Sequence, residues 1–239
     1  MTGSPPVPCQ DAHGGAGAPG PDKVAAVLFD MDGVLVDSEP VWYEVEGGLV
    51  ERLGGRWGRH HQARCIGGTV DATCRYIAEL TGTALAVEEI QAEVMAGMVE
   101  HFRTTLPVIA GAVELVDAVR ARGVPTALVT SSFRVLLDAA LLKLGSDRFD
   151  VTVAGDEVSR GKPHPEPYLT ACDRLGVDPA TAVVVEDALN GVRSAEAAGC
   201  RVVVVPSVAP IDAAPGRRVA GSVATIDPDW LLLPTPIAR

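Results

Sequence analysis

Pairs of acidic residues come directly after two apolar runs of the chain. Asp30 closes the run VAAVLFD, and Asp32 follows two residues later. Glu186 and Asp187 close a later run, AVVVED. Carboxylates that gather in one crevice repel one another, and such a cluster is tolerated when a cation sits among them. Hard oxygen ligands without a nearby His or Cys suit Mg²⁺, which keeps its remaining positions for water and phosphate.

Two further polar side chains fall at comparable positions. Thr130 ends the apolar run PTALVT, and Lys162 lies in a loop just before a predicted helix. The carboxyl ends of parallel strands converge on one crevice, where ligands bind. We therefore expect Thr130 and Lys162 to share a single crevice with the two acidic pairs.

The elements that must position these residues alternate along the second half of the chain. Apolar spacing and closing glycines predict helices over 111–122, 134–144, 166–175 and 190–198. Apolar runs predict strands over 24–30, 125–130, 151–154, 182–186 and 201–205, and a last short strand over 222–226. Such alternation predicts an α/β fold with a doubly wound, Rossmann-like parallel sheet.

One segment breaks this alternation immediately after the first strand. Residues 40–107 show helical spacing throughout and no strand pattern. We therefore expect an inserted all-helical cap domain over 40–107, above the carboxyl ends of the strands. The catalytic core is then expected over 23–39 and 108–239. Residues 1–22 are rich in Pro, Gly and Ala and are predicted to form a disordered tail.

Four short motifs resemble a known family when they are taken in order. The run DMDGVLVDS from Asp30 to Ser38 is similar to the first signature of the haloacid dehalogenase-like (HAD) hydrolase superfamily. Leu128–Thr130, Gly161–Pro163 and Val185–Asp187 with Asn190-Gly191 resemble its second, third and fourth motifs. The resemblance covers about residues 24–205, and the helical insertion resembles the cap of the beta-phosphoglucomutase-like branch.

The resemblance implies a role for each catalytic residue. Asp30 would attack phosphorus and form an aspartyl-phosphate, as carboxylate nucleophiles do. Asp32 would protonate the leaving oxygen and later activate water. Thr130 and Lys162 would bind the transferring oxygens and stabilise developing charge.

The resemblance also implies the residues that hold phosphate and metal. The backbone N–H of Ser131 would add to the phosphate site formed by Thr130 and Lys162. From the residues alone, either serine could cap the following helix; this role is favoured for Ser132 and left open for Ser131. Mg²⁺ would be held by the Asp30 carboxylate, the Asp32 backbone carbonyl and Asp187. Glu186 would either bind the ion itself or contact one of its ligands.

The function that these features favour is a magnesium-dependent phosphatase acting on a small phosphorylated metabolite such as a sugar phosphate. The alternative is a phosphosugar mutase resembling beta-phosphoglucomutase. Such mutases tend to carry cap lysines and a hinge His. Here no lysine occurs between Lys23 and Lys143, and Trp42 lies in the hinge region, which favours hydrolysis. A third possibility is a phosphometabolite-binding protein without turnover.

Composition excludes several other classes of protein. The 239-residue chain is 47% apolar and 21% charged, as expected of a globular protein. Its formal net charge of −11 argues against nucleic-acid and anionic-membrane partners, since both need a basic surface. The N-terminus resembles no signal peptide, and no apolar run approaches the roughly 18 residues of a membrane span. We therefore expect a cytoplasmic protein, and the resemblance implies a monomer.

Overall fold

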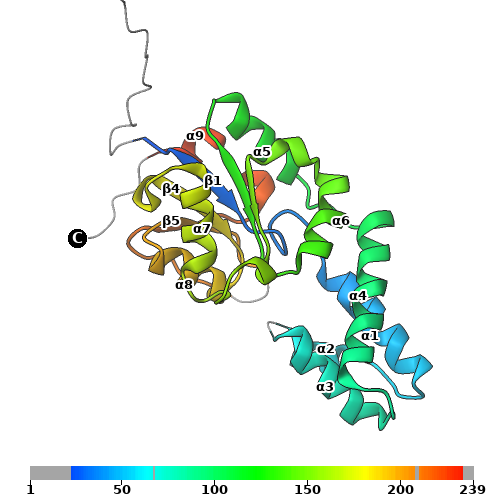
Figure 1. Cartoon of the computed structure of the whole chain (residues 1–239). Coiled ribbons are helices and arrows are strands. Elements are labelled where there is room, and N and C mark those ends of the chain that lie inside the picture. The colour runs from blue at the N-terminus through cyan, green and yellow to red at the C-terminus, as the bar shows by residue number, and fades with distance from the viewer. Residues whose placement is uncertain (1–22, 67, 208–209, 234–239) are drawn as a thin grey trace, which may run out of the picture.

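Six short strands form one parallel sheet in the order β3-β2-β1-β4-β5-β6 (Figure 1). The computed structural model describes residues 23–66, 68–207 and 210–233, so the predicted tail over 1–22 lies outside the described residues. The strands are β1 (Ala26–Phe29), β2 (Thr126–Val129), β3 (Val151–Val153), β4 (Ala182–Glu186), β5 (Arg201–Val204) and β6 (Arg217–Val219). This order is that of a doubly wound sheet, the fold class predicted from the alternation of strands and helices.

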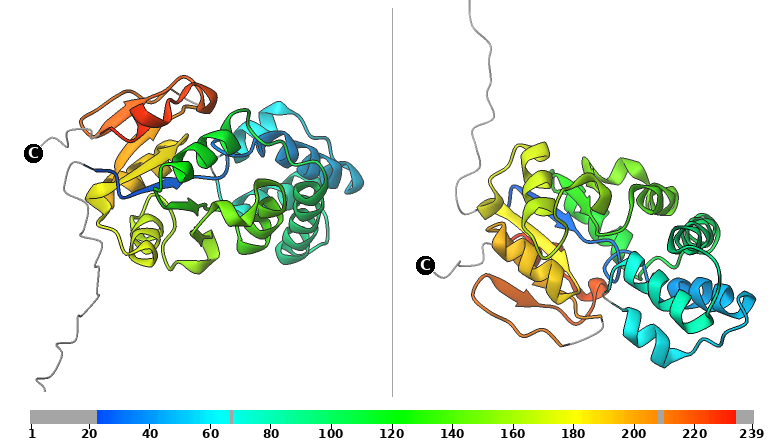
Figure 2. Two further views of the ribbon diagram at one scale, coloured as in Figure 1. Left: turned by 90° about the horizontal axis from the view of Figure 1, so that it is seen from above. Right: turned by 60° about the horizontal axis from the view of Figure 1, so that its bottom comes forward.

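Helices cover both faces of this sheet (Figure 2). On one face pack α5 (Ala112–Ala121), α6 (Arg134–Leu144) and the short α9 (Pro228–Leu231). On the other pack α7 (Glu166–Leu175) and α8 (Leu189–Ala197). Because both faces are covered, every residue of β1, β2, β4 and β5 is buried, and all of them are apolar except Thr126, Glu186 and Arg201.

The insertion after β1 is helical, as predicted. Its helices are α1 (Glu39–Arg52), α2 (Arg59–Cys65), α3 (Val70–Thr81) and α4 (Val87–Thr104), and its described residues contain no strand. Ile90, Val94, Met98 and Phe102 form the buried face of α4. This helix packs against α1 and α3 and also against α6 of the sheet layer, so it joins the insertion to the core (Figure 1).

The two chain segments that enter and leave the insertion are paired with each other. Val36 forms an antiparallel bridge with Val108. The Asp37 N–H donates to the Pro107 carbonyl oxygen over 2.9 Å. The insertion is therefore connected to the sheet by two adjacent, hydrogen-bonded segments.

One predicted strand is wrong. The segment 222–226 contains a 3-10 helix, Val223–Thr225, and the sixth strand lies earlier, at Arg217–Val219. Val223 and Ile226 are both buried, and their spacing of three residues fits a helical turn better than a strand. Among the described residues, no helix is both long enough and apolar enough to cross a membrane.

Candidate active site

The site lies where β1 and β4 run side by side in the middle of the sheet. The chain leaves β1 toward β2 and β3 and later returns to β4 on the opposite side, so the carboxyl ends of β1 and β4 form the switch point of the sheet. Asp30 follows β1, and its N–H donates to the Val185 carbonyl oxygen over 3.0 Å. Asp187 follows β4 in the same way. The fold therefore brings together acids that are more than a hundred residues apart.

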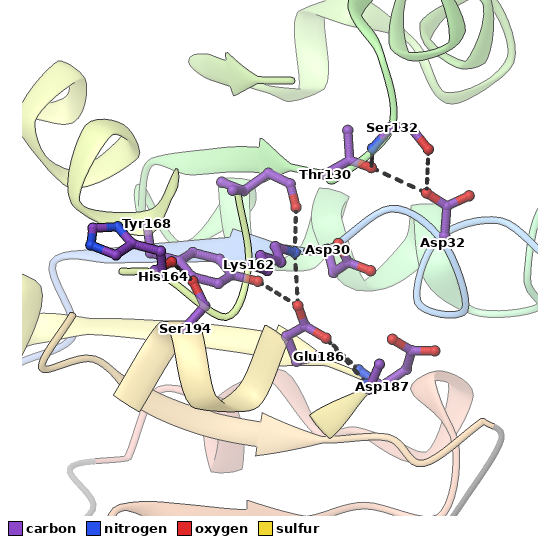
Figure 3. A network of polar contacts seen from close by, with 12 residues as sticks. Asp30, Asp32, Thr130, Ser132, Lys162, His164, Tyr168, Glu186, Asp187 and Ser194 are labelled. Carbon is purple, nitrogen blue, oxygen red and sulfur yellow. Dashed lines mark hydrogen bonds and ion pairs between the residues drawn. The ribbon is translucent and has the colours of Figure 1, made fainter. Parts of the chain in front are cut away.

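Asp30, Glu186 and Asp187 form a buried carboxylate cluster. Each offers an oxygen that lies within 4.8 Å of the oxygens of the other two. Their side chains point toward one another from the ends of the two strands (Figure 3). Two motif glycines leave room for these acids: a Cβ at Gly33 would clash with the Asp187 carboxylate, and one at Gly191 would clash with that of Glu186.

Lys162 is the cation of this cluster. Its Nζ donates to Asp30 Oδ1 over 2.6 Å, to Glu186 Oε1 over 2.8 Å and to the Val129 carbonyl oxygen over 3.0 Å. The side chain is only 5% exposed. Burial alone would lower the pKa of Lys162, but the charges of Asp30 and Glu186 outweigh it and raise that pKa above its ordinary value. The ammonium group is therefore charged at neutral pH.

One lysine does not neutralise the whole cluster. Burial raises the pKa of Asp30 well above its ordinary value; Lys162 opposes this rise, and Glu186 and Asp187 add to it. The pKa of Asp187 is raised to about 7, mainly by burial and secondly by the charge of Glu186. The hydrogen bond from Ser207 acts in the opposite direction and lowers this pKa. The excess negative charge and the all-oxygen donor set fit a divalent cation, which would favour the charged forms of these acids.

Asp32 faces away from the cluster and is held by hydroxyl groups. Oδ1 accepts from Ser38 over 2.5 Å. Oδ2 accepts from Thr130 over 3.1 Å and from Ser132 over 3.0 Å (Figure 3). The structure thus places Thr130 beside Asp32, as the predicted common crevice requires. Ser131 is exposed, and its side chain makes none of the hydrogen bonds found among the described residues.

The predicted role of Ser132 as a helix cap is wrong. The residue before α6 is Phe133, and the Arg134 N–H at the helix start donates to Asp156 Oδ1 over 2.8 Å. The Ser132 hydroxyl is turned toward Asp32 instead, while its N–H donates to Thr130 Oγ1 over 2.9 Å. Asp156, from the 3-10 helix Gly155–Glu157, therefore accepts the hydrogen bond at the helix start, and the Ser132 side chain contacts Asp32.

Comparisons with known proteins identify the family of this chain. A family model described as haloacid dehalogenase-like hydrolase matches residues 24–199. Hexitol phosphatase B of Escherichia coli (strain K12) is 31% identical over 190 residues, which cover 78% of this chain and 86% of that protein. The chain belongs to the haloacid dehalogenase-like hydrolases. This confirms the family expected from the four motifs.

Other relatives of this hydrolase point to the same branch. The phosphorylated carbohydrates phosphatase of Thermotoga maritima is 32% identical over 210 residues, covering 87% of this chain and 96% of that protein. The crystal structure of CbbY from Rhodobacter sphaeroides in complex with phosphate matches with a TM-score of 0.75 and 26% identity, covering 84% of this chain and 96% of that one. The crystal structure of a putative beta-phosphoglucomutase from Thermotoga maritima matches with a TM-score of 0.71 and 30% identity, covering 83% of this chain and 94% of that one. The hydrolase falls in the beta-phosphoglucomutase-like branch, as its helical insertion predicted.

Several polar residues of this hydrolase's site were not identified from the sequence. Ser38 and Ser132 contact Asp32, Ser207 donates to Asp187, and Tyr168 donates to Glu186. Tyr168 carries the clearest sequence signal, because it is a phenol on the buried face of a helix that directly follows the Lys162 loop. A buried phenol needs a hydrogen-bond partner.

Proposed function

We propose that this hydrolase is a magnesium-dependent phosphatase that cleaves a small phosphorylated metabolite of the sugar or polyol class. The observation that carries the proposal is the Asp30 carboxylate, which lies at the switch point of the sheet, 2.6 Å from Lys162 Nζ and within a cluster of two further acids. This arrangement combines a nucleophile, a fixed cation and a divalent cation site.

In the proposed reaction, Asp30 Oδ attacks the phosphorus of the ester. The Asp30–phosphorus bond forms while the bond to the leaving oxygen breaks, and that oxygen takes a proton from Asp32. Asp32 then accepts a proton from water, which attacks phosphorus and releases phosphate and free Asp30. Lys162 and Thr130 donate hydrogen bonds to the phosphoryl oxygens and oppose the charge that develops there.

We propose Mg²⁺ as the cation, held by the Asp30 and Asp187 carboxylates and the Asp32 backbone carbonyl, with Glu186 beside them. When bound, it neutralises charge between the carboxylate nucleophile and the phosphate. The Thr130 and Ser132 hydroxyls now bound to Asp32 would turn to phosphoryl oxygens as substrate enters. Ser131 contributes its backbone N–H to the same oxygens in this proposal.

The helical insertion, proposed as a cap domain over residues 40–107, would supply specificity and exclude bulk water. Glu39 begins α1 next to Ser38, and Gln62 Nε2 donates to its backbone and carboxylate oxygens over 3.0 and 3.3 Å. Glu39 is half-buried, and its pKa is raised by burial first and then by the nearby charge of Asp32. A carboxylate and an amide are suited to bind the hydroxyl groups of a sugar or polyol.

The test is a screen of phosphate esters with Mg²⁺, read as released phosphate. We expect turnover of sugar or hexitol phosphates, and we expect Asp30→Asn to lower kcat at least about 1,000-fold while the protein stays folded. Asp37→Asn, an exposed acid in the same loop, is the matched control. Undiminished phosphate release by Asp30→Asn would contradict the proposal, as would a wild-type protein that hydrolyses no ester in the panel.

Product analysis with glucose 1-phosphate and a bisphosphate primer separates hydrolysis from the mutase alternative. The described cap contains no lysine, which favours phosphate release. Conversion to glucose 6-phosphate without phosphate release would instead assign the chain as a mutase.

A further inference from the structure

The carboxylate of Glu186 already has a full set of protein donors. Oε1 accepts from Lys162 Nζ over 2.8 Å and from the Tyr168 hydroxyl over 2.7 Å. Oε2 accepts from the N–H groups of Asp187 and Ala188 over 3.0 and 3.2 Å. A carboxylate offers about four acceptor positions, so all of those of Glu186 are in use. The side chain can turn only by losing one of these hydrogen bonds.

Lys162 depends on this fixed carboxylate for its direction. Its three donors go to Glu186, Asp30 and the Val129 carbonyl oxygen. An ammonium group on a flexible four-carbon stem has no preferred direction of its own, so the acceptors around it decide where it points. If Glu186 moves, the Lys162 Nζ loses one of the three contacts that aim it at Asp30.

Tyr168 is the donor that the mechanism does not otherwise use. It lies on α7, and its side chain is fully buried. Its hydroxyl reaches Glu186 from the side opposite the reacting carboxylate of Asp30, while its ring lies 4.8 Å from Lys162 Nζ (Figure 3). A phenylalanine would fill the same space without the polar tip. The hydroxyl is therefore explained by its hydrogen bond and not by core packing.

We propose that Tyr168 is a positioning residue that fixes Glu186 and, through it, aims Lys162 at Asp30 and the phosphoryl group. Its hydroxyl touches no reacting atom. The effect on catalysis rests on the proposed phosphatase activity, whereas the effect on Lys162 can be measured without substrate or metal.

The decisive variant is Tyr168→Phe, with Tyr76→Phe as the matched control. Tyr76 belongs to the helical insertion, and its hydroxyl lies 2.6 Å from His61 Nδ1, so both variants remove one hydrogen-bonded phenol oxygen. We expect Tyr168→Phe to lower kcat about tenfold with KM changed less than about twofold, because the missing contact acts on the phosphoryl-transfer step. Tyr76→Phe should leave both constants near wild type.

A second readout follows the Lys162 ammonium group directly by nitrogen-15 NMR in EDTA. The chain has three lysines, and Lys23 and Lys143 are exposed, so only Lys162 should give a protected ammonium signal. We expect this signal to shift or broaden in Tyr168→Phe and to stay unchanged in Tyr76→Phe. Urea unfolding of both variants shows that the proteins compared are folded.

An unchanged Lys162 signal in Tyr168→Phe would overturn the inference. So would a kcat for that variant no lower than for Tyr76→Phe. If the wild-type protein hydrolyses no phosphate ester, the proposed function fails, and the ammonium signal alone still decides whether Tyr168 positions Lys162.

Discussion

Replacing Lys162 with Met should destabilise the protein in a pH-dependent way. Lys162 Nζ forms ion pairs with two buried carboxylates, that of Asp30 at 2.6 Å and that of Glu186 at 2.8 Å. Removing one partner of a buried ion pair leaves an uncompensated charge and costs about 3–5 kcal/mol. We therefore expect Lys162→Met to lower the free energy of unfolding by about 3 kcal/mol or more at pH 8 without a divalent metal.

The sign of the pH dependence follows from the carboxylates that remain. Burial already raises the pKa of Asp30 in the folded protein, and loss of Lys162 removes the charge that opposed this rise. An acid whose pKa is higher in the folded state binds more protons there, so the folded state gains stability as the pH falls. The deficit of Lys162→Met relative to wild type should therefore shrink from pH 8 to pH 5.

The assay is urea unfolding in EDTA at both pH values, with Lys143→Met as control. Lys143 lies on α6 and is exposed, so its loss should change stability by less than about 0.5 kcal/mol. A deficit for Lys162→Met that is equal at pH 8 and pH 5, or below about 1 kcal/mol at pH 8, would refute the reasoning.

Two further variants test other parts of the structure. Gly191→Ala places a methyl group against the Glu186 carboxylate, so it should destabilise the protein by about 1–3 kcal/mol and lower kcat. Gly221 has open space around it, and Gly221→Ala should change neither stability nor kcat in the same urea-unfolding and phosphate-release assays. Burial and then Glu39 raise the pKa of Glu46 to about 7. Ionising Glu46 therefore costs stability as the pH rises through 7, and Glu46→Gln should gain about 2–3 kcal/mol relative to wild type between pH 5 and pH 9. The exposed Glu44→Gln should show no such gain in urea unfolding, and parallel pH profiles for all three proteins would contradict this account.

The sheet and the main acids could be predicted because each depends on a local pattern. An apolar run buried on both faces, closed by an acid, identifies both a strand and the crevice at its end, and this holds for Asp30 and Glu186 alike. The all-helical insertion was equally visible, since its apolar spacing continues without a strand run.

The hydroxyl contacts could not be predicted in the same way. Ser132 and Asp32 are separated by 100 positions in the chain. Ser132 is free to contact Asp32 because Asp156 accepts the hydrogen bond from the N–H at the start of α6, and the sequence does not show that contact. The strand wrongly expected over 222–226 fails for a related reason. Its apolar residues suit either a strand or a helical turn, and only packing on the core decides between them.

The paired segments at Val36 and Val108 bear on how such proteins diversify. Both ends of the insertion leave the sheet through one hydrogen-bonded pair, so a different helical unit could replace residues between them without changing the order of the strands. An exchange of this kind would change the insertion, to which we assign substrate specificity in our proposal, while the acids at the ends of β1 and β4 stay in place. Recombination at these two points would be a direct route to chimeric proteins with new substrate ranges.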